Sequence, residues 1–228
     1  MSEGTFRVLV VCTGNICRSP YAERLLRSAL ARIAAATGDA RWTTDVLVTS
    51  AGTLAMVGRP IEPPMAALLD RGGVAGAVLV DPHAARQLER DLVADADLVL
   101  GLAREHRREV VMVLPSASRR VFALNEFARL LDDAVASGVL AGTAREAASG
   151  APAAVLEAVV DAAAMRRGFA LPPDDPGADD VLDPYHRGDG AYAASAAHMI
   201  DLVQRIERGV LAGVAAGSAG ASAAGAPR

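Results

Sequence analysis

Short apolar runs alternate with amphipathic segments along the first 131 residues of the chain. The runs are five or six residues long, a length typical of buried strands, and they cover 6–11, 45–50, 97–101 and 120–124. Between and after them, apolar residues at helical spacing predict helices over 21–33, 63–71, part of 81–95, 104–113 and a segment capped by Asn125. This alternation predicts an α/β fold, a three-layer wrapped sheet of about four parallel strands with helices on both faces.

The pattern changes over residues 137–180, which are rich in Ala, Gly, Pro and Asp. Residues 153–167 still carry an apolar stripe that predicts a helix, and 189–209 predict a final helix. The last residues are mostly Ala, Gly and Ser, a composition with few large side chains to bury. We therefore predict one domain over 1–208, with 137–180 as an insertion within it, and a disordered tail over 209–228.

The strongest chemical signal is the loop between the first strand and the first helix, residues 12–19, which read CTGNICRS. A loop at the carboxyl end of a strand and the N-terminus of a helix can bind a phosphate through backbone N–H groups and the helix dipole. Arg18 adds a forked, permanently charged donor, and Cys12 lies where the same positive field favours a thiolate nucleophile. Gly14 and Asn15 both tolerate left-handed backbone. We expect Ser19 to cap the helix and Pro20 to take its first position.

Composition narrows the function classes. The net charge of −4 argues against a protein that binds nucleic acid through phosphate contacts. All 23 basic residues are arginine, which excludes a P-loop nucleotide-binding motif because that motif requires lysine. The two cysteines, Cys12 and Cys17, form no disulfide framework, and the 4 histidines are scattered. With no secretory leader and no apolar run that could span a bilayer, we expect a cytoplasmic protein without metal or cofactor.

A second candidate group stands just before the last predicted helix, in the triplet Asp183-Pro184-Tyr185. Phosphoryl transfer needs a proton donor for the leaving oxygen, and a rigid Pro184 can hold Asp183 over the loop. An Asp beside a Pro is also a common turn. The pattern alone leaves both interpretations open.

Residues 12–19 resemble the phosphate loop of the low-molecular-weight protein tyrosine phosphatases. That family carries its general acid in an Asp-Pro pair near the C-terminal helix, and residues 183–185 match the pattern one for one. The resemblance implies hydrolysis of phosphotyrosine through a cysteinyl-phosphate intermediate, with Cys12 as nucleophile and Asp183 as general acid. Arg18 and the loop amides would hold the phosphate; the loop residues are Thr13, Gly14, Asn15, Ile16 and Cys17.

The resemblance also suggests supporting roles. Ser19 would donate a hydrogen bond to the Cys12 sulfur, although helix capping alone would also explain it. Cys17 would pair with Cys12 on oxidation, or serve as a small buried apolar residue. Tyr185 would form one wall of the substrate pocket. The opposite wall in this family often carries an aromatic residue, but here Met56 supplies the apolar contact.

Three alternatives remain open. A phosphoarginine phosphatase on the same scaffold carries Thr where this chain has Ile16, so Ile16 favours tyrosine substrates. An arsenate reductase needs further cysteines downstream, and this chain has none after Cys17. A non-catalytic phosphate-binding module would be expected to lose Cys12 or Asp183. The partners we expect are tyrosine-phosphorylated proteins, with the chain itself a monomer or weak homodimer.

Overall fold

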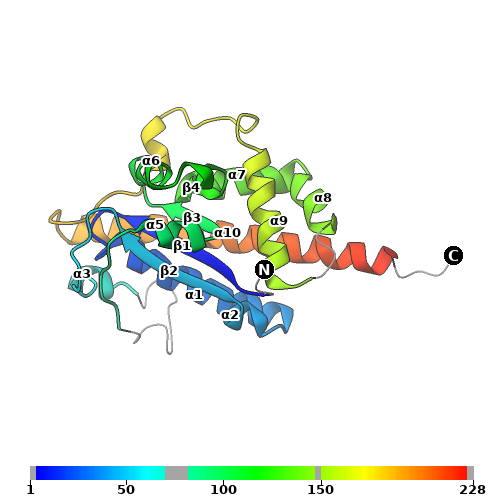
Figure 1. Ribbon diagram of the computed structural model, residues 1–228, viewed down its shortest axis with the longest axis horizontal. Helices are drawn as coiled ribbons and strands as arrows, with labels where there is room; N and C mark the ends of the chain where they lie inside the picture. The colour runs from blue at the N-terminus through cyan, green and yellow to red at the C-terminus, as the bar shows by residue number, and fades with distance from the viewer. Residues whose placement is uncertain (1–3, 70–81, 147–149, 225–228) are drawn as a thin grey trace.

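The computed structural model describes residues 4–69, 82–146 and 150–224 and centres on a parallel four-stranded sheet (Figure 1). The strand order is β2-β1-β3-β4, so the first strand lies inside the sheet and pairs with both β2 and β3. The strands are β1 (Phe6–Cys12), β2 (Val46–Gly52), β3 (Leu98–Gly101) and β4 (Val121–Ala123). The four predicted parallel strands are confirmed, and their carboxyl ends meet at one edge where Cys12 pairs with Gly52.

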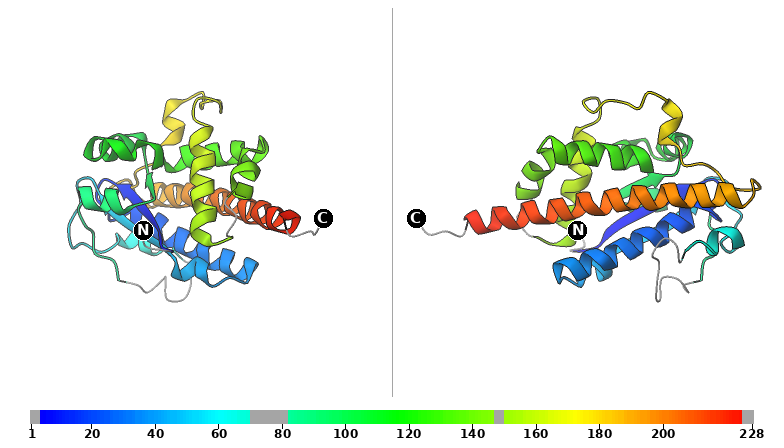
Figure 2. Two further views of the ribbon diagram at one scale, coloured as in Figure 1. Left: turned by 45° about the vertical axis from the view of Figure 1, so that its right-hand side comes forward. Right: turned by 180° about the vertical axis from the view of Figure 1, so that it is seen from behind.

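Helices cover both faces of the sheet. The helices are α1 (Arg18–Thr37), α2 (Arg41–Thr44), α3 (Pro63–Ala66), α5 (Arg90–Asp95), α6 (Arg104–Val113), α7 (Leu124–Ala136), α8 (Val139–Glu146), α9 (Pro152–Met165) and α10 (Asp189–Ala224). The described residues also include the 3₁₀ turns η2 (Pro115–Arg120), between α6 and β4, and η3 (Pro176–Asp179), between α9 and α10. The long α10 runs beside α1 on one face of the sheet (Figure 2).

Alternation along β1 explains the layers, because successive side chains of a strand point to opposite faces. Phe6, Val8 and Val10 belong to the larger core, with apolar residues of α1, α7, α9 and α10. Leu9 and Val11 belong to a smaller core under α5, α6 and η2. The predicted three-layer architecture is confirmed.

The segment 137–180 is largely helical. The helix predicted over 153–167 is present as α9, and α8 precedes it without having been predicted. Both helices pack on α10 and on α7. Arg167, just after α9, places its guanidinium 3.8 Å from the centroid of the Phe122 ring, which ties this segment to β4.

The predicted disordered tail is wrong as far as Ala224, because α10 continues as one helix to that residue. The reason is close packing along glycines spaced by four residues. A Cβ on Gly209 would lie 2.4 Å from Leu131 Cδ2, and one on Gly213 would touch Val159 at 3.4 Å. The small residues that suggested disorder therefore form a seam that lets neighbouring helices approach α10. Residues 225–228 lie outside the described residues.

Three other boundaries differ from the predictions. The predicted helix over 63–71 is present as α3 only to Ala66, and its last two residues lie outside the described residues. Within 82–95 only α5 is helical. Asn125 caps no helix: α7 begins one residue earlier, and the Asn125 amide instead donates to the Ala178 carbonyl.

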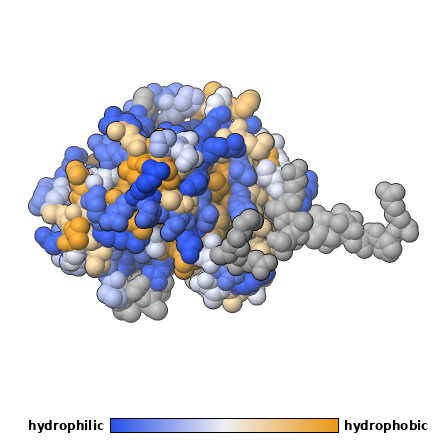
Figure 3. All heavy atoms as spheres, in the orientation of Figure 1, coloured by the Kyte–Doolittle hydropathy of each residue, from blue (hydrophilic) through white to orange (hydrophobic). Residues whose placement is uncertain are grey.

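No helix in the described part of the chain is long and apolar enough to cross a membrane. On the face seen in Figure 3, hydrophilic residues surround small hydrophobic patches.

Candidate active site

The loop between β1 and α1 turns its backbone carbonyl groups outward. Backbone N–H groups of the loop after β2 bind the first three carbonyls: Thr53 N donates to Cys12 O (2.9 Å), Leu54 N to Thr13 O (3.0 Å) and Met56 N to Gly14 O (3.0 Å). The next carbonyls also have partners. The His83 side chain places Nε2 2.7 Å from Asn15 O, Glu62 N donates to Ile16 O (2.8 Å), and Tyr21 N, in the first turn of α1, donates to Cys17 O (3.3 Å).

These contacts fix where the N–H groups point. In a trans peptide the N–H lies opposite the preceding C=O, and no cis bond occurs among the described residues. The N–H groups of residues 13–18 therefore point away from the surrounding segments and toward the pocket. Asn15 supports the curvature with a left-handed φ of 55°. Such a ring of N–H groups at the N-terminus of α1 forms an anion-binding bowl, which we call the phosphate loop.

Asn15 and Ser19 lie behind the bowl. The fully buried Asn15 amide donates from Nδ2 to Ser19 Oγ and to Ser50 Oγ, both at 2.9 Å, and its Oδ1 accepts from Arg86 N at 2.9 Å. Ser19 Oγ lies 2.9 Å from Cys12 Sγ. The predicted capping role of Ser19 is wrong, because α1 begins at Arg18 and Cys17 occupies the N-cap position. Since the Ser19 oxygen accepts from Asn15, its own proton is directed to the sulfur or to a nearby carbonyl.

Arg18 joins the phosphate loop to a segment 165 residues away. Its Nη2 lies 2.7 Å from Asp183 Oδ2 and 3.4 Å from Thr13 Oγ1, and its Nη1 donates to Val181 O at 3.3 Å. The Arg18 side chain is 7% exposed, whereas that of Asp183 is 41% exposed. The structure thus brings together the residues that the sequence placed at opposite ends of the chain.

The pocket above the bowl contains nearly every predicted site residue. Its floor is formed by the loop, and its lining residues are Cys12, Thr13, Gly14, Ile16, Cys17, Arg18, Leu54, Met56, Asp183 and Tyr185. Leu54 was not predicted; its side chain is 74% exposed at the rim, and nothing in the sequence separates it from other loop residues. Tyr185 is half-buried and contacts the His186 ring, with 3.9 Å between the ring centroids.

The two cysteines, Cys12 and Cys17, are both buried. Both are free thiols. Burial, opposed by a hydrogen bond from Tyr192, raises the pKa of Cys17 to about 12. Cys17 is therefore a neutral thiol near neutral pH, and its pairing with Cys12 on oxidation stays a prediction.

His106 was missed by the sequence analysis. It lies in the first turn of α6, is 2% exposed, and places Nε2 3.0 Å from Thr13 Oγ1. Burial first, and then the charge of Arg18, lower the pKa of His106 to about 4. A neutral imidazole thus supports the phosphate loop from below. The only signal in the sequence was its position just after the third strand.

No group of three or more His, Cys, Asp or Glu residues that could hold a metal ion occurs in the described part of the chain.

A loop of this geometry at the carboxyl edge of a parallel sheet is typical of α/β proteins that bind anions. Residues 7–136 match the sequence profile of the family described as low molecular weight phosphotyrosine protein phosphatase. The probable low molecular weight protein-tyrosine-phosphatase EpsP of Ralstonia solanacearum is 37% identical over 127 residues, which cover 55% of this chain and 76% of EpsP.

Solved structures share the fold at lower identity. A mutant of YwlE from Bacillus subtilis superposes with a TM-score of 0.57 at 22% identity, covering 90% of this chain and 97% of that one. The YwlE arginine phosphatase from Geobacillus stearothermophilus gives a TM-score of 0.54 at 23% identity, covering 89% and 91%.

The chain belongs to the low molecular weight phosphotyrosine protein phosphatase family, a family of hydrolases. The matched residues include the whole phosphate loop, whereas Asp183 and α10 lie beyond them.

Proposed function

We propose that this protein hydrolyses phosphotyrosine in proteins through a cysteinyl-phosphate intermediate. The observation that carries the proposal is the convergence of Cys12, Arg18 and Asp183 on one pocket lined by loop N–H groups. The Cys12 thiolate would be the nucleophile, the Arg18 guanidinium would bind the phosphate, and the Asp183 carboxylic acid would supply the proton.

The reaction would take two steps. In the first, Cys12 Sγ bonds to phosphorus, the bond from phosphorus to the phenol oxygen breaks, and that oxygen takes the proton of Asp183. In the second, water attacks phosphorus, gives its proton to Asp183, and displaces the Cys12 sulfur. Arg18 and the loop N–H groups stabilise the equatorial oxygens in both steps, and the Ser19 hydroxyl stabilises the departing sulfur.

The Arg18–Asp183 ion pair links the proposed acid to the phosphate-binding group. The Arg18 Nη2 that lies 2.7 Å from Asp183 Oδ2 is also the group that would bind the phosphate. When a phosphate dianion takes that donor, Asp183 loses its cation and gains an anionic neighbour. The phosphate and the Asp183 carboxylate would therefore compete for one guanidinium donor.

The pocket walls support an aromatic substrate. Tyr185 and Met56 offer an aromatic face and a thioether for contact with a phenyl ring. Ile16, which lines the same pocket, presents a branched apolar side chain where a phosphoarginine phosphatase carries Thr. Phosphoarginine nevertheless remains the second candidate substrate, because an arginine phosphatase shares the fold.

The test is hydrolysis of a phosphotyrosine peptide, a phosphoarginine peptide and an alkyl phosphate by the wild type and by Cys12→Ser. We expect the wild type to prefer phosphotyrosine, and the variant to lose at least about 10³-fold in kcat because an alcohol replaces the thiolate. Rapid quenching of the wild type should trap phosphate on Cys12. Equal rates in the two proteins would exclude cysteine catalysis, and a preference for phosphoarginine would replace the proposed substrate.

A further inference from the structure

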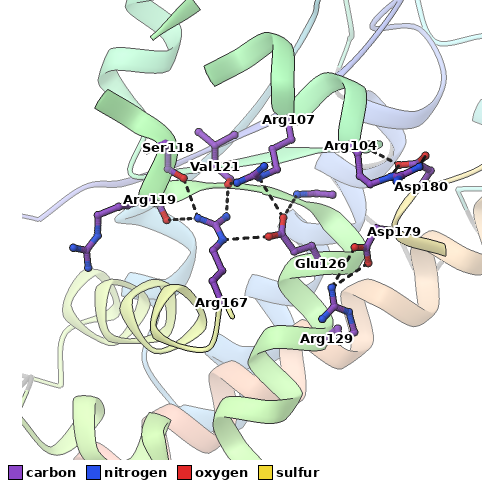
Figure 4. Close-up of polar contacts among 11 residues, drawn as sticks. Arg104, Arg107, Ser118, Arg119, Val121, Glu126, Arg129, Arg167, Asp179 and Asp180 are labelled. Carbon is purple, nitrogen blue, oxygen red and sulfur yellow. Dashed lines mark hydrogen bonds and ion pairs between the residues drawn. The ribbon is translucent and has the colours of Figure 1, made fainter. Parts of the chain in front are cut away.

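The first turn of α6 receives its helix cap from a distant segment. Ala103 occupies the N-cap position and has no side chain that can bind the free N–H groups of the helix. Asp180 supplies the missing acceptor: its Oδ1 accepts from Arg104 N at 2.7 Å, across 76 residues of sequence. The Arg104 side chain completes the contact from Nε (3.3 Å) and Nη2 (3.1 Å), as Figure 4 shows.

The chain between Asp180 and Asp183 is short and is held on both sides of Val181. Val181 N donates to Leu102 O at 2.8 Å, and Val181 O accepts from Arg18 Nη1 at 3.3 Å. The Val181 side chain is buried at 2% exposure. Three residues span at most about 10 Å, so the position of Asp180 restricts where the Asp183 carboxylate can lie.

The same helical turn also contacts the phosphate loop. His106, two residues after Arg104, places Nε2 3.0 Å from Thr13 Oγ1. One turn of α6 therefore touches both the segment that carries Asp183 and the loop that carries Cys12. The first turn of α6 therefore restricts the distance between the Asp183 segment and the phosphate loop.

We propose that Asp180 is a positioning residue for the general acid: it caps α6 from the chain before Asp183 and so holds Asp183 in register with the phosphate loop. This inference rests on the proposed function. Asp180 touches neither substrate nor the reacting atoms. Its effect passes through the fixed backbone of residues 181–183.

A neighbouring ion pair provides a matched control. Asp179 pairs with Arg129 Nη2 at 3.2 Å, and Arg129 lies on α7, not on α6 (Figure 4). Further along, Glu126 pairs with Arg107 at 3.4 Å and with Arg167 at 3.1 Å (Figure 4). The Asp179–Arg129 and Glu126–Arg167 pairs fasten residues 137–180 to α7, and the Glu126–Arg107 pair joins α7 to α6. None of the three pairs includes Asp180 or Arg104.

The test compares Asp180→Ala, Asp180→Asn and Asp179→Ala on aryl phosphates whose leaving phenols range from strongly to weakly acidic. We expect Asp180→Ala to lose about tenfold in kcat with the poorest leaving group and little with the best, since only the former depends on a placed proton donor. Asp180→Asn keeps an acceptor for Arg104 N, so it should recover most of this loss. Asp179→Ala should follow the wild type within about twofold.

Two further measurements accompany the kinetics: orthovanadate binding tests whether the phosphate loop is intact, and thermal unfolding tests whether each variant is folded. Asp180→Ala should bind orthovanadate as the wild type does, because the phosphate loop is unchanged. A loss of rate that is equal for all leaving groups, or an equal loss in Asp179→Ala, would overturn the inference. If Asp180→Ala does not fold, Asp180→Leu, which removes the acceptor but keeps a side chain of similar size, is compared with Asp179→Leu, and equal leaving-group dependence in those two overturns the inference.

Failure of the proposed function would be recognised separately. In that case the wild type itself would not hydrolyse aryl phosphates, or Cys12→Ser would be equally active. If the wild type turns over through Cys12 and Asp180→Ala shows the wild-type leaving-group dependence, only the positioning role is wrong.

Discussion

The two segments that form the pocket are held in contrasting ways. The phosphate loop is buried against its surroundings: Asn15 and Ser19 are 0% exposed, and every carbonyl from Cys12 to Cys17 is hydrogen-bonded. The acid segment, residues 180–186, is only partly buried: Val181 is in the core, but the Asp183 side chain is 41% exposed and His186 is exposed with a left-handed φ of 59°. The phosphate loop is enclosed by its neighbours, whereas the acid segment is anchored at a few buried residues.

This contrast fits the two tasks that the proposed reaction requires. A bowl that stabilises phosphate must hold its N–H groups in place before the substrate arrives, because reorganising them would cost part of their effect. A proton donor must release Arg18, take up a proton and meet a leaving group. The comparison predicts that changes that disturb the phosphate loop affect folding and phosphate binding, whereas a change at Asp183 affects turnover.

The largest effect is expected for Gly52→Ala. A Cβ on Gly52 would lie 2.4 Å from Thr13 O and 3.0 Å from Asn15 N, both backbone atoms of the phosphate loop. Because backbone cannot swing aside as a side chain can, the loop must shift. We expect a loss on the order of 10³-fold in kcat/KM and about 3 kcal/mol in the free energy of unfolding. Steady-state kinetics and denaturant unfolding measure the two.

Gly142→Ala is the matched control for that substitution. Gly142 lies inside α8, and a Cβ added there would have no heavy atom within 4 Å outside its own helical turn. Alanine is the better helix former, so the variant should gain up to about 1 kcal/mol in the free energy of unfolding and keep full activity. If both variants behave alike, the phosphate loop is not as tightly packed as the comparison requires.

The second prediction concerns the pH dependence of stability beneath the phosphate loop. Burial and Arg18, opposed by Asp183 and Asp180, lower the pKa of His106 from 6.5 to about 4. The unfolded chain therefore binds a proton between these values while the folded protein does not. The stability is complete above pH 6.5 and is lost as the pH falls toward 4, by on the order of 3 kcal/mol.

Urea unfolding at several pH values tests this linkage against His106→Gln, which keeps a polar side chain beside Thr13 but cannot titrate. The slope of stability against pH between 6.5 and 4 should be smaller in the variant. Parallel curves for the two proteins would show that His106 is not the group responsible.

The features that could be predicted from the sequence are those formed by contiguous residues. The phosphate loop was found because its residues are contiguous and its strand and helix have clear periodicity. The four strands were found for the same reason. Local sequence also suggested Ser19 as a helix cap, but the Asn15 amide and the Cys12 sulfur take its hydroxyl instead, because tertiary contacts outweigh local propensity.

What the sequence did not disclose depends on contacts between distant segments. The helical tail follows from glycines of α10 that fit against α7, α8 and α9, and such a fit cannot be inferred from composition. His106 and Asp180 stand beside Thr13 and Arg104 only after folding. Asp183 was identified by its Pro and Tyr neighbours, yet its pairing with Arg18 is a property of the three-dimensional structure.

The third prediction addresses the acid segment directly. Asp183→Asn removes the proton donor, so kcat should fall by about 10²-fold for a substrate with a poor leaving group and much less for one with a good leaving group. The variant also removes the carboxylate that pairs with Arg18, so its affinity for inorganic phosphate should equal or exceed that of the wild type. Leaving-group series and isothermal titration measure the two effects. A weakened phosphate affinity would mean that the two segments cannot be separated in function.

The smallest effect is expected at the outer wall of the pocket. Tyr185 is half-buried, and the ring of the exposed His186 lies 3.9 Å from its own, centroid to centroid. Tyr185→Leu keeps an apolar wall but removes the aromatic face, so KM for an aryl phosphate should rise by about three- to tenfold, in line with the energy of one aromatic contact. KM for an alkyl phosphate and kcat for both should stay near the wild-type values, while Tyr185→Phe should match the wild type throughout. An equal rise in KM for aryl and alkyl substrates would show that Tyr185 holds the acid segment in place and does not contact the substrate ring.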